Sequence, residues 1–280
     1  MAAPVAPPPT PQIRPNPRAS IAARTLRSDR WWVAPAISAT VLFLFICYAT
    51  WAAFVGNNYY AKPYISPFYS PCLAWQCGRA TQHGVGGVPH LGVFGTWYAW
   101  SPALIILVFP LGFRLTCYYY RRAYYRSFWL SPPACAVGEP HKKYTGETRF
   151  PLIAQNIHRY FFYIGLVFNL ILTYDAVVAF VEPRSAAMGG GYVGLGSFVL
   201  LTNAVLLWCY SLGCHSCRHI VGGRLKHFSR HPIRFKFWGL VTKMNARHMQ
   251  FAWASLIFVA LTDMYVRLAA SGWLGNGRWI

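Results

Sequence analysis

Acidic residues are scarce in this chain of 280 residues, which has only six Asp and Glu side chains against 26 Lys and Arg. So few carboxylates argue against an enzyme that works through a pair of acidic side chains. The serine-protease, P-loop and dinucleotide-binding patterns are missing as well. The sequence therefore points away from the common hydrolases and nucleotide-dependent enzymes.

Charge of either sign is limited, because only 11% of residues are charged while 55% are hydrophobic and 18% aromatic. This composition is too apolar for an ordinary soluble domain. The formal net charge of +20 is compatible with nucleic-acid binding, but the basic residues fall in blocks between long apolar runs. We therefore predict a membrane protein without a nucleic-acid partner.

Five apolar runs are long enough to cross a bilayer as helices. They predict an all-α membrane protein, a bundle of five transmembrane helices over residues 31–55, 91–117, 159–181, 193–218 and 249–271. The third run contains Asp175, and the fifth contains Asp263 and Arg267 one turn apart. Ionisable groups inside a bilayer are functional candidates, although an Asp–Arg pair can equally serve structure alone.

The basic residues also predict the orientation of the bundle. Twenty-one of the 26 Lys and Arg residues fall on one side, in the N-terminal segment and in the second and fourth linkers. By the positive-inside rule, the N-terminus is cytoplasmic and the C-terminus external. We expect a disordered cytoplasmic tail (1–30), a transmembrane domain (31–272) and a short external tail (273–280), with no signal peptide.

The first outer loop contains two cysteines, Cys72 and Cys77. On the oxidising side of the membrane a disulfide between them is the leading interpretation. Metal binding together with His83 and His90 is the alternative.

Thiols and imidazoles gather at the predicted cytoplasmic ends of the helices. Antiparallel neighbours bring these ends to one depth, so the side chains can converge; they are Cys117, His158, Cys214, His215, Cys217, His219 and His248. On a continuous fourth helix, Cys214 and Cys217 share one side, and His215 and His219 share nearly the opposite side. Such donors suit a transition metal or an iron–sulfur cluster, so we interpret the protein as a carrier of electrons.

Two cofactors fit these residues. A Rieske-type [2Fe–2S] cluster would place Cys214 and Cys217 on one iron and His158 and His248 on the other. A haem b would take two of the four imidazoles of His158, His215, His219 and His248. The Cys-x-x-Cys spacing favours the cluster, because a haem does not use it. The structural alternative is that the thiols are buried apolar groups and the imidazoles interface residues.

The chain resembles the single-chain, five-helix membrane anchor of succinate dehydrogenases from actinobacteria. The resemblance rests on residues 66–72 (SPFYSPC), 117–121 (CYYYR), 132–135 (PPAC), 158–163 (HRYFFY), 214–219 (CHSCRH) and 245–249 (NARHM). It implies a multi-pass protein of the cell membrane, in complex with a flavoprotein subunit and an iron–sulfur subunit on the cytoplasmic face. Electrons from succinate would then pass to menaquinone or ubiquinone, and the complex could form a higher oligomer.

The sequence departs from haem-bearing anchors, which carry axial histidines toward both faces of the membrane. Here the first predicted helix has no histidine, which favours one cofactor near the cytoplasmic face. Residue type and depth suggest Trp31, Tyr119, Arg122 and His219 for a quinone site. A transition-metal or small-solute transporter that uses the same Cys and His set is the alternative function.

Overall fold

The computed structural model describes residues 27–73, 100–138, 152–184 and 191–274. Residues 1–26 and 275–280, which hold most of the two predicted tails, lie outside the described residues, as do Cys77, His83 and His90 of the outer loop.

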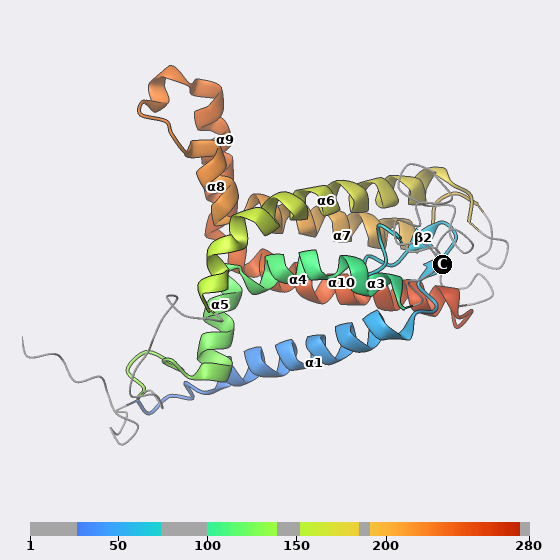
Figure 1. The fold of residues 1–280 in the computed structure, drawn as a ribbon, viewed down its shortest axis with the longest axis horizontal. Coiled ribbons are helices and arrows are strands. Elements are labelled where there is room, and N and C mark those ends of the chain that lie inside the picture. Colours follow the sequence, from blue (N-terminus) through green and yellow to red (C-terminus); the bar gives the residue numbers. More distant parts are fainter. Residues whose placement is uncertain (1–26, 74–99, 139–151, 185–190, 275–280) are drawn as a thin grey trace, which may run out of the picture.

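Four long helices form the body of the molecule and lie side by side (Figure 1). Each is long and apolar enough to cross a membrane; they are α1 (Val33–Val55), α6 (His158–Val181), α7 (Leu195–Leu212) and α10 (His248–Ala270). α7 packs against both α6 and α10. These helices confirm four of the five predicted runs and the all-α membrane class.

The second predicted run is not one continuous helix in its described part. It consists of α3 (Pro102–Ile106), which packs on α1, and α4 (Val108–Leu115), which follows it and packs on α6. Pro110 explains the break at Leu107, because proline has no N–H to donate to the carbonyl of Ile106. Residues 91–99 lie outside the described part of the chain. Four helices of the described part qualify as membrane spans, so the fifth span stays a prediction.

The fourth predicted run ends earlier than expected, at Leu212 instead of Arg218. Gly213 and an extended Cys214 (ψ 144°) separate α7 from α8 (His215–Gly222). α8 packs on α9 (Pro232–Ala246), which follows the short 3₁₀ helix η7 (Phe228–Arg230), and this pair projects sideways from the bundle (Figure 1). The apolar run therefore contains a bend that its composition does not reveal.

The same end of the bundle carries shorter helical segments. α5 (Tyr118–Tyr124) and the π-helical turn η3 (Tyr125–Trp129) run across it, and the 3₁₀ helix η5 (Leu152–Ile157) leads into α6 (Figure 1). The starts of α6 and α10 and the end of α7 therefore meet α5 and α8 at one place.

The opposite end is closed by a small hairpin of β1 (Tyr60–Ala61) and β2 (Tyr64–Ile65), paired antiparallel. Here Cys72 is disulfide-bonded, in agreement with the prediction for that residue, while its predicted partner is outside the described part of the chain. Just after the hairpin, Ser70 donates a hydrogen bond to Asp175 of α6.

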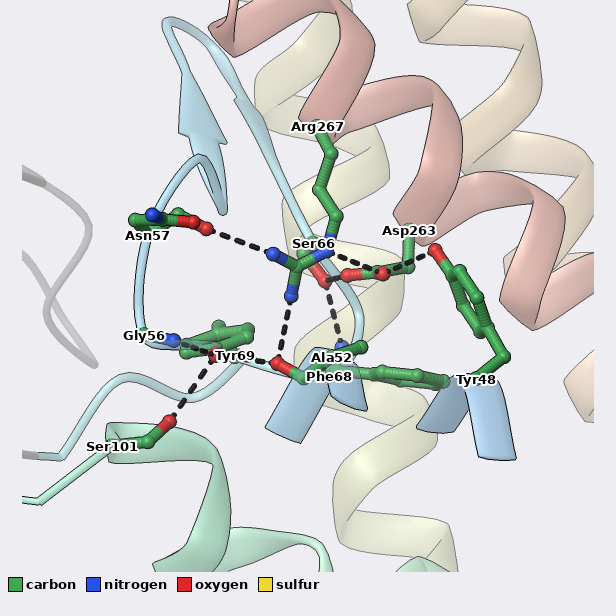
Figure 2. A network of polar contacts seen from close by, with 10 residues as sticks. All are labelled: Tyr48, Ala52, Gly56, Asn57, Ser66, Phe68, Tyr69, Ser101, Asp263 and Arg267. Carbon is green, nitrogen blue, oxygen red and sulfur yellow. Dashed lines mark hydrogen bonds and ion pairs between the residues drawn. The ribbon is translucent and has the colours of Figure 1, made fainter. Parts of the chain in front are cut away.

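A polar network built on Asp263 and Arg267 connects the segments at this end of the bundle (Figure 2). Arg267 donates to Asp263 at 2.7 Å and to the carbonyls of Ala52 and Asn57, each at 2.8 Å. Asp263 also accepts hydrogen bonds from Ser66 and from Tyr48, the latter at 2.6 Å. Because every partner belongs to α1, α10 or the loop after α1, this pair acts as a clamp between those segments.

Candidate functional site

A cavity of about 610 Å³ opens at the end where α5, α6, α8 and α10 meet. Six of the seven Cys and His candidates line it: Cys117, His158, Cys214, His215, His219 and His248. The sequence-based prediction that these groups converge is therefore confirmed, with the exception of Cys217.

Two thiol–imidazole contacts lie at the centre of the site. The Nε2 atom of His158 is 3.0 Å from the Sγ atom of Cys214, and the Nε2 atom of His248 is 3.5 Å from that of Cys117. Cys117 and Cys214 also belong to one buried apolar cluster. Each thiol therefore contacts one imidazole, although the four residues come from four separate segments.

Helix ends place these donors. His158 and His248 are the first residues of α6 and α10, while Cys117 and Cys214 are the N-caps of α5 and α8. These helix ends meet at the cavity, which all four side chains line.

Close packing orients the His158 ring. A side chain at Gly112 of α4 would lie 2.3 Å from the ring of Phe161 on α6, so this glycine lets the two helices approach closely. The approach lets Phe113 stack on His158, with ring centroids 5.1 Å apart, and brings the Oγ1 atom of Thr116 within 2.8 Å of its Nδ1 atom. With Nδ1 engaged, Nε2 is the nitrogen that faces Cys214.

The His248 ring is held in a similar way. Tyr210 of α7 stacks on it with centroids 5.0 Å apart and an interplanar angle of 7°, and Tyr119 meets its edge. Gly213 permits the approach, since a Cβ atom there would lie 3.2 Å from the Nδ1 atom of His248. That Nδ1 atom is buried and has no hydrogen-bond partner among the described residues.

Burial controls the protonation state of the Cys214 thiol. Cys117 and Cys214 are 2% and 1% exposed. Burial, and after it the neighbouring Cys117, raises the pKa of the Cys214 thiol to about 12. At neutral pH this thiol is therefore protonated in the metal-free protein, and metal binding would release a proton.

The four side chains are of the types that bind transition metals and iron–sulfur clusters. Within the described ranges, no three His, Cys, Asp or Glu side chains lie close enough to hold one metal ion. Two thiols and two imidazoles are nevertheless the ligand set of a Rieske-type centre, in which two irons share the four donors.

Cys217 occupies a different environment from the other candidates. It belongs to the same buried apolar cluster as Cys117 and Cys214 but does not line the cavity. The prediction that Cys214 and Cys217 share one face of a continuous helix is wrong, because the chain bends at Gly213 and Cys214 precedes α8. A ligand role for Cys217 stays a prediction.

His215 and His219 form a separate pair at the mouth of the cavity. Their Nε2 atoms are 2.8 Å apart, as expected for residues one helical turn apart. Both side chains are exposed. Of the four residues suggested for a quinone site, Tyr119 and His219 line the cavity. Trp31 lies in the turn before α1 and Arg122 on α5, and neither is part of the lining.

Three residues near the site were missed by the sequence-based prediction: Arg114, Tyr120 and Tyr210. The Nη1 atom of Arg114 donates to the Tyr120 hydroxyl at 2.7 Å, and its guanidinium lies 4.8 Å from the centre of the Tyr210 ring. A cation within an apolar run was the available indication, but Arg114 was assigned to the basic linker at the edge of that run.

Comparisons with known proteins agree with this architecture. Residues 33–272 match the family described as actinobacterial succinate dehydrogenase subunit SdhC. Among solved structures, the chain is similar to a chain described as "Mycobacterium smegmatis Sdh1 complex in the apo form". The two are 51% identical with a TM-score of 0.79, over 95% of this chain and 98% of that chain. A comparison with curated proteins gives no match. The family match over most of the sequence, together with the four apolar helices, shows that this multi-pass membrane protein belongs to the actinobacterial succinate dehydrogenase subunit SdhC family.

Proposed function

We propose that the chain is the membrane anchor and quinone-reducing subunit of a succinate:quinone oxidoreductase. It would bind the flavoprotein and iron–sulfur subunits at the end of the bundle that carries the cavity. Family membership and the likeness to a chain of an Sdh1 complex support the place in such an assembly. The observation that carries the electron-transfer role is the convergence of two thiols and two imidazoles on one cavity.

For the redox centre we propose a Rieske-type [2Fe–2S] cluster held by Cys117, Cys214, His158 and His248. Cys117 replaces Cys217 in the predicted set, because its sulfur contacts His248 and lines the cavity. When bound, such a cluster accepts and donates one electron at a time. Haem b remains the alternative cofactor, but it would leave two cavity-lining thiols without a role.

The contacts that hold the two imidazole rings in place support this assignment. Thr116 holds one nitrogen of His158, so its ring presents a single nitrogen to the cluster. Tyr210 and Tyr119 fix the plane of the His248 ring. These contacts would preserve ligand orientation through repeated changes of charge at the centre.

The quinone would bind in the same cavity. Its volume of about 610 Å³ lies in the range of small-molecule sites, and Tyr119 and His219 line it as donors for the two quinone carbonyls. Reduction of one quinone to a quinol takes two electrons, which arrive singly from the iron–sulfur subunit, and two protons from the aqueous side. The hydrogen-bonded pair of His215 and His219 connects the cavity with the surface and offers a route for these protons.

The proposal is tested by two assays on the purified complex. One measures succinate oxidation with a water-soluble dye, and the other measures succinate-dependent quinone reduction. A Cys214→Ser variant should keep the dye reaction, which the partner subunits perform, and lose most quinone reduction. An exposed cysteine provides the control, since Cys135→Ser should leave both reactions unchanged. Full quinone reduction by the Cys214→Ser variant would contradict the proposal.

A further inference from the structure

Arg114 is a cation that has no acidic partner among the described residues, and it lies inside the bundle beside the proposed redox site. The guanidinium donates to the hydroxyls of Tyr120 at 2.7 Å and Ser255 at 3.1 Å, and to the Ala252 carbonyl at 3.4 Å. No described carboxylate forms an ion pair with it. The hydrogen-bond partners of Arg114 in the described part of the chain are all neutral, so they do not offset its positive charge.

An aromatic ring connects this charge with one of the proposed ligands. The guanidinium lies 4.8 Å from the centre of the Tyr210 ring, and Tyr210 stacks on the His248 ring with centroids 5.0 Å apart. Arg114 also interacts electrostatically with both His248 and Cys117. One fixed charge thus acts on an imidazole and a thiol of the ligand set.

We propose that Arg114 sets the reduction potential of the centre bound by Cys117, Cys214, His158 and His248. The inference rests on the proposed function. Reduction adds one negative charge to the centre, and a positive charge nearby stabilises the reduced form. Arg114 therefore raises the potential and helps the centre accept an electron from the partner subunit. Arg114 acts on the centre through its electrostatic field and does not bind the cofactor itself.

The size of the effect follows from simple electrostatics. Two contacts of 4.8 and 5.0 Å separate the guanidinium from the His248 ring. At roughly 10 Å and an effective dielectric constant of about 20, one unit charge changes a one-electron equilibrium by about tenfold. That factor corresponds to about 59 mV for a one-electron couple.

Redox titration of the purified complex tests this role, with the nitrogen-coupled EPR signal of the centre as the readout and iron content as a control. The Arg114→Gln variant should retain its iron, while the reduction potential of the centre should fall by about 59 mV. Arg114→Lys keeps the charge and should restore most of the loss. Lys243→Gln removes an exposed cation of α9 and should leave the potential unchanged.

A second pair of variants keeps Arg114 itself in place. Ser255→Asp puts a carboxylate beside the guanidinium, which neutralises its charge, and should lower the potential like Arg114→Gln. Ser255→Asn is the neutral control and should have little effect. An unchanged potential in iron-loaded Arg114→Gln or Ser255→Asp protein would overturn the role of Arg114. Absence of the iron centre from the wild-type chain would instead overturn the proposed function.

Discussion

At the residue scale, the two cysteines that could complete the ligand set differ in their contacts. Cys117 lies 3.5 Å from the Nε2 atom of His248 and lines the cavity, whereas Cys217 is packed away from it. Both are buried, so burial alone does not distinguish a ligand from an apolar core residue. The distinction rests on which sulfur faces an imidazole.

Serine substitutions separate the two cysteines. Cys117→Ser and Cys214→Ser should each lose most of the iron bound by this chain, because a hydroxyl replaces a soft thiolate ligand. Cys217→Ser should retain it, with only a modest loss of stability. Iron analysis, corrected for the iron of the partner subunits, measures the difference. Retention in Cys117→Ser with loss in Cys217→Ser would restore the original sequence-based pair.

Gly213 offers a second test at this scale. A Cβ atom at this position would lie 2.9 Å from the Cys209 carbonyl oxygen and 3.2 Å from both the Met244 carbonyl oxygen and the Nδ1 atom of His248. Gly213→Ala should therefore displace His248 and cost about 1–3 kcal/mol of stability. Gly239→Ala is the matched control, because its surroundings within 4 Å are open. Thermal unfolding and iron content should both distinguish the two variants; equal behaviour would contradict this role of Gly213.

At the element scale, the long helices were predictable and their interruptions were not. Apolar runs with few charges identify α1, α6, α7 and α10 because a bilayer demands length and hydrophobicity. Hydrophobicity does not show where a helix bends, so the break at Gly213 was missed. The bend also determines which cysteines can face the same ligand, because the relative directions of Cys214 and Cys217 depend on it. The identities of the donors could therefore be predicted, but their pairing could not.

The clamp of Asp263 and Arg267 belongs to the same scale, because it joins α10 to α1 and the loop that follows. The pair is almost completely buried, with side chains 0% and 8% exposed. Removal of one partner from a buried ion pair typically costs roughly 3–5 kcal/mol, since it leaves an uncompensated charge. Arg267→Met should therefore lower the unfolding temperature strongly, and the double variant Asp263→Asn, Arg267→Met should lower it less.

The proposed redox site provides the internal control for this prediction. It lies at the opposite end of the bundle from the clamp (Figure 1), so folded Arg267→Met protein should keep its iron. Equal stability of Arg267→Met and the wild type would show that the ion pair does not hold these segments together. Selective loss of iron would show instead that the two ends are coupled.

At the scale of the whole molecule, the basic residues and the proposed site should lie on the same side of the membrane. A reporter inserted at Gly222, in the segment that follows the site, should read out as cytoplasmic. A reporter fused after Ile280 should read out as external. The reason is the uneven distribution of Lys and Arg between the linkers. Reversed signals would place the cavity on the external side, where the iron–sulfur subunit could not reach it.

The central claim is that two thiols and two imidazoles hold a one-electron centre in the membrane subunit. Pulsed EPR of the purified complex, reduced only mildly, tests it most directly. Imidazole ligands raise the potential above that of clusters held by cysteine alone, so a mild reductant should reduce this centre first. We predict a reduced [2Fe–2S] signal with couplings to two histidine nitrogens, lost in His158→Ala, His248→Ala double-variant protein. A cluster signal without nitrogen coupling, or the spectrum of a six-coordinate haem, would contradict the claim.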